Sequence, residues 1–133
     1  MSGLETVELD ARNRFCIEVR IEDPVSGNSF SIECDIDTGN PDAIALPQDY
    51  EGRLTRHLGT EPRGGAGIGE SDIYAAEITG IGQIKTAHTT SVYFSLPRSM
   101  PTGLIGMDLL KYMVSEIYDG PDNTKMDLKP THL

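Results

Sequence analysis

The stretch IECDIDTGN, residues 32–40, determines how the rest of this chain is interpreted. Apolar residues alternate with polar ones up to Asp37, which is followed by a small hydroxyl residue, Thr38, and by Gly39. This order places a carboxylate at the end of a strand, in a turn whose backbone can come close to a ligand. On its own, so short a motif more often marks an ordinary polar turn. The choice between the two interpretations depends on the remaining sequence.

Length and composition indicate a small β-rich protein. The chain has 133 residues, enough for one domain with a sizeable core and too few for two, so we expect a single domain over residues 1–133. A hydrophobic content of 38%, with 14 Gly, 8 Pro and no Trp, suits a β-rich globule with many turns. The net charge is -10, which disfavours nucleic acids and anionic membranes as partners because both are themselves negative.

Targeting, disulfide and metal patterns are all lacking in the sequence. Residues 1–10 contain neither the basic segment nor the apolar core of a signal peptide, and no stretch approaches the roughly eighteen apolar residues of a membrane span. We therefore expect a cytoplasmic protein with no membrane partner. Cys16 and Cys34 alternate to opposite faces of a predicted hairpin, which predicts two free, buried thiols. His57, His88 and His132 are scattered and lack metal-ligand spacing, so we expect no metal.

Alternating apolar residues predict a hairpin that carries Asp37 at its end. The period of two holds over residues 15–22 and again over residues 30–36, and the turn residues DPVSGN, 23–28, separate the two runs. Beyond the motif the pattern predicts a strand at residues 43–46 closed by Pro47, then a short helix at residues 48–58. Further strands are expected at residues 72–78, 81–84, 90–96, 114–118 and 125–128, and a helix is expected to begin near Gly106 after a short buried strand.

The glycine-rich segment RGGAGIG, residues 63–69, is the most permissive stretch of backbone. A phosphate-binding loop is disfavoured because the segment lacks the Lys and Ser or Thr of a P-loop, and Glu70 stands where a dinucleotide fingerprint needs its third glycine. A strand-like run follows directly. The segment is therefore interpreted as the tip of a hairpin.

Three features thus follow in a fixed order: Asp-Thr-Gly, a glycine-rich hairpin, and the apolar pair Leu104 and Ile105 with Gly106, leading into a helix. This order resembles the retropepsin-like aspartic proteases, and residues 36–47, IDTGNPDAIALP, look most like their single-domain bacterial and archaeal members. The resemblance covers roughly residues 14–128. It implies an all-β acid-protease fold, a closed barrel of short strands with one short C-terminal helix, in which the apolar pair threads behind the Asp-Thr-Gly loop.

The resemblance also implies an activity, that of an aspartic endopeptidase acting as a homodimer on an extended peptide or protein. The chemistry needs two carboxylates, whereas this chain supplies one, so Asp37 is expected to face its symmetry mate across a water and to share one proton with it. Activity at acid to mildly acid pH follows, without metal, nucleotide or other cofactor. Thr38 is expected to hydrogen-bond across the twofold axis and Gly39 to present backbone to substrate. The flap residues implied to contact substrate are Gly64, Gly65, Ala66, Gly67, Ile68 and Gly69.

The chain departs from the retroviral pattern in two places. Asn40 stands where a small Ala or Ser usually follows the glycine. Met107 replaces an Arg, and Pro41 replaces the Asp with which that Arg pairs, so both charges are missing together and neither is orphaned. Two alternatives stay open. A calcium loop is disfavoured because Gly39 comes one place early and Leu46 is not an acid, whereas a catalytically silent dimerisation or peptide-binding scaffold has the same fold.

Overall fold

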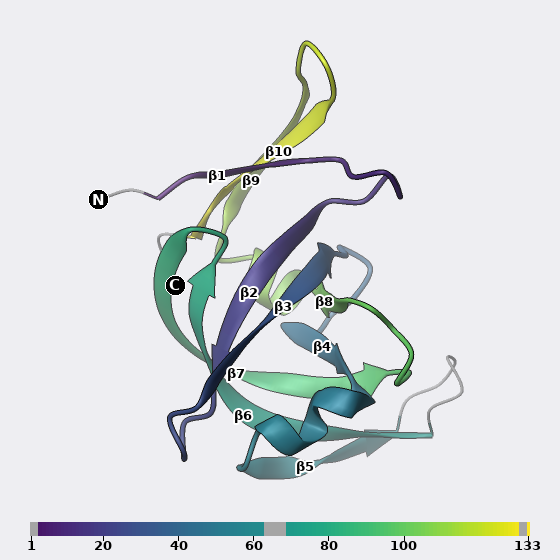
Figure 1. Ribbon diagram of the computed structural model, residues 1–133, viewed down its shortest axis with the longest axis vertical. Coiled ribbons are helices and arrows are strands. Elements are labelled where there is room, and N and C mark those ends of the chain that lie inside the picture. The colour runs from purple at the N-terminus through teal and green to yellow at the C-terminus, as the bar shows by residue number, and fades with distance from the viewer. Residues whose placement is uncertain (1–2, 63–68, 131–132) are drawn as a thin grey trace.

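A computed structural model describes residues 3–62, 69–130 and 133, apart from the side chains of residues 114 and 115 (Figure 1). In chain order its elements are β1 (Glu5–Glu8), β2 (Cys16–Glu22), β3 (Ser29–Ile36), β4 (Ile44–Pro47), the 3-10 helix η1 (Gln48–Arg53), β5 (His57–Pro62), β6 (Glu70–Ile81), β7 (Ile84–Leu96), β8 (Gly103–Ile105), α1 (Met107–Leu110), β9 (Val114–Asp119) and β10 (Thr124–Lys129).

Six of the described strands close into a barrel. They follow the order β2-β3-β8-β4-β7-β6, and pairing of β6 with β2 completes the circle, while β5 extends β6 on its other edge. Most neighbours are antiparallel, but β8 runs parallel to β3, and β4 runs parallel to β7. The expected all-β closed barrel with one short C-terminal helix is confirmed.

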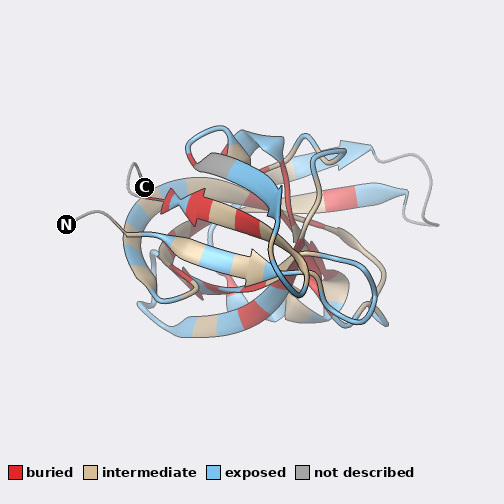
Figure 2. Cartoon of the chain, turned by 90° about the horizontal axis from the view of Figure 1, so that it is seen from above, coloured by how far each residue is buried: buried red, intermediate tan, exposed pale blue. Residues whose placement is uncertain are grey.

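The alternation along β2 and β3 fills the barrel interior. Ile17, Val19 and Ile21 are buried from β2, and Ile32 and Cys34 are buried from the paired strand β3. Figure 2 shows the resulting succession of buried and exposed segments along the strands. Because side chains alternate with a period of two, a slip of one residue would expose this entire set, so burial specifies the register and with it the place where Asp37 emerges.

A second sheet, which the sequence predicted only in part, lies beside the barrel. Its order is β1-β10-β9. The β9–β10 hairpin extends away from the barrel, and β1 lies alongside β10 (Figure 1). The strands β9 and β10 were expected, whereas β1 was not. Strand β1 has only four residues, and its pairing with β10 joins the two ends of the chain, which no local pattern encodes.

Two expected elements differ from the structure. The helix expected at residues 48–58 is a 3-10 helix that ends at Arg53, and from His57 the chain instead pairs with β6 as strand β5. The strand expected at residues 81–84 is the turn between β6 and β7, because Ile81 pairs with Ile84 across Gly82 and Gln83. Gly82 has a φ of 58°, a conformation that glycine adopts readily and that closes a two-residue hairpin loop.

The two cysteines are free, as expected, and lie on opposite faces of the β2–β3 hairpin, since Cys16 pairs with Asp35 and Cys34 with Ile17. Cys34 is buried, whereas Cys16 is only half-buried, so the expectation of two buried thiols was wrong for Cys16. Burial is the main cause that raises the pKa of the Cys34 thiol, and it keeps this residue in its neutral, unreactive form.

Asp23, at the β2–β3 turn, is a buried carboxylate held by several donors. Its carboxylate accepts hydrogen bonds from the Thr55 hydroxyl at 2.6 Å and from the Ser26 hydroxyl at 2.8 Å. Burial is the largest influence and on its own raises the pKa of Asp23, but the hydrogen bonds from Thr55, Ser26 and the Val25 backbone together outweigh it and lower the pKa to about 2. The ionised form is therefore the stable one in the folded protein.

Replacing Asp23 by asparagine is expected to reduce the free energy of unfolding at pH 7 by about 2 kcal/mol. The amide carries no charge, and its NH2 group cannot accept the bonds that the carboxylate accepts from Thr55 and Ser26. Because the folded pKa lies below the unfolded value, the stabilisation is complete above about pH 4 and disappears as the pH falls through about 2. Urea unfolding of both proteins should therefore differ at pH 7 and converge near pH 2. Asp122→Asn, at an exposed position, is the control. A constant difference between the Asp23→Asn variant and wild type at all pH values would contradict this assignment.

Candidate active site

The Asp-Thr-Gly loop is held at the end of β3 by the strand that threads behind it. The Asp37 backbone N–H donates to the carbonyl oxygen of Ile105 at 2.9 Å, which extends the parallel pairing of β3 and β8. On the other side of the loop, the Met107 N–H donates to the Asn40 carbonyl at 2.7 Å and the Gly106 N–H donates to the Ala43 carbonyl at 3.0 Å. The loop is therefore fixed by backbone hydrogen bonds at both of its ends.

Gly106 is required by this close approach. A Cβ atom at this position would lie 2.0 Å from the carbonyl oxygen of Asp42 and 2.4 Å from that of Asn40. Its φ of -112° is open to any residue, so the need for glycine is a need for space. The order of Asp-Thr-Gly and a late glycine in the sequence thus corresponds to one packed contact in space.

The Asp37 carboxylate is positioned by its own turn. The Gly39 N–H donates to Asp37 Oδ1 at 2.9 Å, and the Asn40 N–H donates to the Asp37 carbonyl at 3.1 Å. Asp37 is half-buried, while Thr38 and Gly39 are exposed. The Thr38 hydroxyl makes no hydrogen bond within the part of the chain that the structure describes. The turn therefore presents a carboxylate, a hydroxyl and a glycine backbone at the surface, where a ligand or a second chain can reach them.

Asn40, the residue that departs from the retroviral pattern, is directed back into the loop. Its side-chain Oδ1 accepts a hydrogen bond from the Asp42 backbone N–H at 3.2 Å. Asparagine favours such local turns. The bond holds together the segment whose carbonyl oxygens lie against Gly106. A supporting role in the loop accounts for Asn40 in place of a smaller residue.

The sequence did not predict an ion pair beside the loop, in which a buried carboxylate binds a half-exposed arginine. Asp35, 4% exposed, accepts from Arg12 Nη2 at 2.7 Å and Nη1 at 3.2 Å, and from the Thr102 hydroxyl at 3.1 Å. The alternation of β3 places Asp35 on the face opposite to the buried Ile32 and Cys34. Arg12 also binds Asp10 at 2.8 Å, so two carboxylates offset one guanidinium. Asp35, buried two residues before Asp37, is thereby anchored to the segment that precedes β2.

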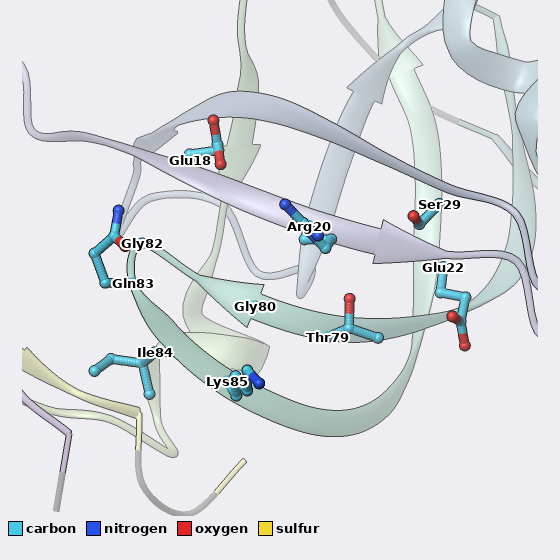
Figure 3. A pocket seen from close by; sticks show the side chains of 10 residues that line it. All are labelled: Glu18, Arg20, Glu22, Ser29, Thr79, Gly80, Gly82, Gln83, Ile84 and Lys85. Carbon is cyan, nitrogen blue, oxygen red and sulfur yellow. The ribbon is translucent and has the colours of Figure 1, made fainter.

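A pocket of about 430 Å³ opens at Asp37, lined also by Arg12, Arg14, Asp35 and residues 100–102 and 104. Another pocket of similar size, about 400 Å³, lies between β2 and the β6–β7 turn. Glu18, Arg20 and Lys85 are among the residues that line it (Figure 3). That second pocket carries charges of both signs but no carboxylate in a constrained turn. The pocket at Asp37 is therefore the better candidate for chemistry.

The glycine-rich segment connects β5 and β6, which pair as a hairpin up to Pro62 and Glu70. Of the residues expected to contact substrate, Gly69 is exposed and directly precedes β6, whereas Gly64, Gly65, Ala66, Gly67 and Ile68 lie outside the described residues. The base of this hairpin is tied to η1, because the Tyr74 hydroxyl donates to Glu51 at 3.4 Å. The expectation of a hairpin at this place is met by its two strands.

Two of the three histidines have partners of an ordinary kind. His57 Nε2 lies 3.0 Å from Asp72 Oδ1, and the His88 ring lies 5.3 Å from that of Tyr112. His132 lies outside the described residues. Among the residues that the structure describes, no group of three possible ligands surrounds a metal position, and no helix there is long and apolar enough to cross a membrane.

The closed barrel and the Asp-Thr-Gly loop threaded by β8 define the fold of the retropepsin-like aspartic proteases. The crystal structure of a retropepsin-like aspartic protease from Rickettsia conorii is similar to this chain, with a TM-score of 0.61, and the match covers 97% of this chain and 92% of that chain. The two sequences are 17% identical, so the likeness concerns the fold alone. No protein-family model and no curated protein sequence matches the chain.

Proposed function

We propose that this protein is an aspartic endopeptidase that acts as a homodimer, with residues 1–133 forming one domain of each protomer. The observation that carries the proposal is the Asp37 carboxylate, which is held by the Gly39 N–H at 2.9 Å on a loop fixed from behind by β8, at the mouth of a pocket. The retropepsin-like fold supports it. Because each chain has one such loop, the active site requires two chains.

In the proposed mechanism a water lies between Asp37 and its symmetry mate. Two carboxylates at hydrogen-bonding distance cannot both ionise at low cost, so the pair holds one proton. The ionised carboxylate accepts a proton from the water as its oxygen attacks the peptide carbonyl carbon, and the protonated carboxylate donates to the carbonyl oxygen. The carboxyl group that took the proton from water then donates it to the amide nitrogen as the carbon–nitrogen bond breaks. The other carboxylate takes back a hydroxyl proton from the tetrahedral intermediate, which leaves a carboxylic acid product and restores the shared proton. Thr38 braces the two loops and the β5–β6 hairpin covers an extended substrate.

A catalytically silent scaffold is the second candidate, and the exposed edge of β9 offers a surface for the chain pairing that it requires. Ile117 is 61% exposed and Tyr118 is 36% exposed, both on β9, which has no strand on its outer edge within the described part of the chain. An uncovered edge strand with apolar side chains is suited to pairing with another chain. Such pairing serves a scaffold as well as an enzyme, so activity must decide between the two.

The concentration dependence of cleavage tests the homodimeric enzyme. With a peptide substrate found in a broad library, the activity per chain should rise with protein concentration in parallel with the dimer fraction measured by sedimentation, because the monomer holds one carboxylate only. Full activity of a strictly monomeric species would refute the shared site. A folded dimer that cleaves no peptide of the library, at any pH between acid and neutral, would leave the scaffold as the function.

A further inference from the structure

Two arginines line the pocket at Asp37, and only one of them is already neutralised. Arg12 Nη2 lies 2.8 Å from Asp10 Oδ2 and 2.7 Å from Asp35 Oδ1, so its charge is matched by two carboxylates. Arg14 forms no ion pair with the rest of the described chain. Its guanidinium is therefore available to a ligand that enters the pocket.

The backbone places Arg14 beside Asp37. The Ile36 N–H donates to the Phe15 carbonyl at 2.8 Å, in line with the antiparallel register of β2 and β3. Continued by one residue on each chain, this register brings Arg14 opposite Asp37, and facing residues of antiparallel chains direct their side chains to the same side. Both residues line the pocket. Asp10 fixes this position, since its N–H donates to the Arg14 carbonyl at 2.9 Å and its Oδ1 accepts the Arg14 N–H at 3.1 Å.

Part of the pocket lining is apolar. Met100 and Pro101, from the segment that leads into β8, and Leu104, from β8 itself, line the pocket together with Thr102. The pocket thus combines hydrocarbon surface with one free guanidinium, next to the carboxylate proposed to activate water. This combination fits a side chain with a short aliphatic stem and a negatively charged end, because arginine binds a carboxylate with paired, charge-assisted hydrogen bonds.

Resting on the peptidase proposed above, we propose that this pocket binds a glutamate or aspartate side chain of the substrate peptide, close to the bond that is cut, and that Arg14 selects it. The chain as a whole carries a net charge of -10, so an acidic side chain is repelled unless a local cation compensates. Arg14 provides that compensation at one position. The other substrate positions are then expected to exclude acidic residues.

Cleavage of a peptide library randomised around the scissile bond tests this subsite. Wild type should select Glu or Asp at one position within a few residues of the cut, and exchange of that residue for its amide, Glu to Gln, should lower kcat/KM about tenfold or more. Arg14→Ala should abolish the difference between Glu and Gln. Arg14→Glu should reverse the preference to Lys or Arg at the same position, which a loss of folding cannot produce.

Arg20→Ala is the matched control, because Arg20 lies on the exposed face of β2 and lines the other pocket. It should keep the wild-type preference. Cleavage without an acidic preference, or a preference that survives in Arg14→Ala, overturns the subsite and leaves the peptidase standing. If the Arg14 variants are monomeric in sedimentation while wild type is dimeric, Arg14 belongs to the interface and the subsite is refuted. Absence of any cleavage by the folded dimer refutes the peptidase and the subsite together.

Discussion

Asp37→Asn is expected to lower the rate of peptide cleavage by a factor of about 10²–10⁴ or more while the dimer stays folded. The amide keeps an oxygen that can accept the Gly39 N–H, now 2.9 Å from Asp37 Oδ1, so the turn retains its hydrogen bond. It cannot accept a proton from water at any relevant pH, and general acid–base catalysis accounts for a loss of this size. The measurement is kcat/KM on a peptide that wild type cleaves, with sedimentation of both proteins.

Binding of a transition-state mimic separates the catalytic assignment of Asp37 from a structural one. A peptide with a hydroxyl in place of the scissile carbonyl should raise the melting temperature of wild type and much less that of Asp37→Asn, since in the proposed mechanism the hydroxyl lies between the paired carboxylates. Asp122→Asn, in an exposed turn, should behave as wild type in both assays. Undiminished cleavage by Asp37→Asn would remove this residue from the mechanism.

Gly106→Ala is expected to have the largest effect on stability. The added Cβ would lie 2.0 Å and 2.4 Å from two backbone carbonyl oxygens of the Asp-Thr-Gly loop, those of Asp42 and Asn40. Backbone atoms cannot rotate away as a flexible side chain can, so the loop and β8 must separate. We expect a loss of about 3 kcal/mol in the free energy of unfolding, a fall of about 10 °C in the melting temperature, and loss of cleavage.

Gly52→Ala is the matched control for this substitution. Gly52 lies in η1, where a Cβ would meet no atom within 4 Å, and its backbone does not adopt a positive φ. The free energy of unfolding of the Gly52→Ala variant should stay within about 0.5 kcal/mol of wild type, or rise slightly because alanine restricts the unfolded chain. Equal melting temperatures for Gly106→Ala and Gly52→Ala would show that β8 does not support the loop as the structure indicates.

The position of the candidate site was predictable because its signals are local. The alternation that buries Ile32 and Cys34 of β3 ends at Asp37, and Gly39 follows at once, so strand, carboxylate and turn are encoded in consecutive residues. The late Gly106 is distant in sequence, but its place after an apolar pair and before a helix made it visible through a family resemblance. The hairpin of β9 and β10 was predictable for the same local reason, since two short runs flank a turn.

Other features were decided only when the chain closed on itself. Residues 57–58 were expected in a helix, yet pairing with β6 makes them a strand, because backbone hydrogen bonds to a neighbouring strand outweigh a weak local preference. Strand β1 exists only through β10, more than a hundred residues away. In neither case does the local sequence contain the partner that stabilises the element.

The sequence by itself determined the alternation of the β2–β3 hairpin and the carboxylate at its end, through a period of two and turn residues that act over a few positions. Only the tertiary structure decided what surrounds that carboxylate. Asp35 lies on the outer face of β3, and it is nevertheless a buried partner of Arg12 and Thr102 because β3 lies between the segment before β2 and the segment before β8. Burial makes such an ion pair necessary, since an unpaired charge in the interior is costly, and only the folded chain brings the compensating residues within reach.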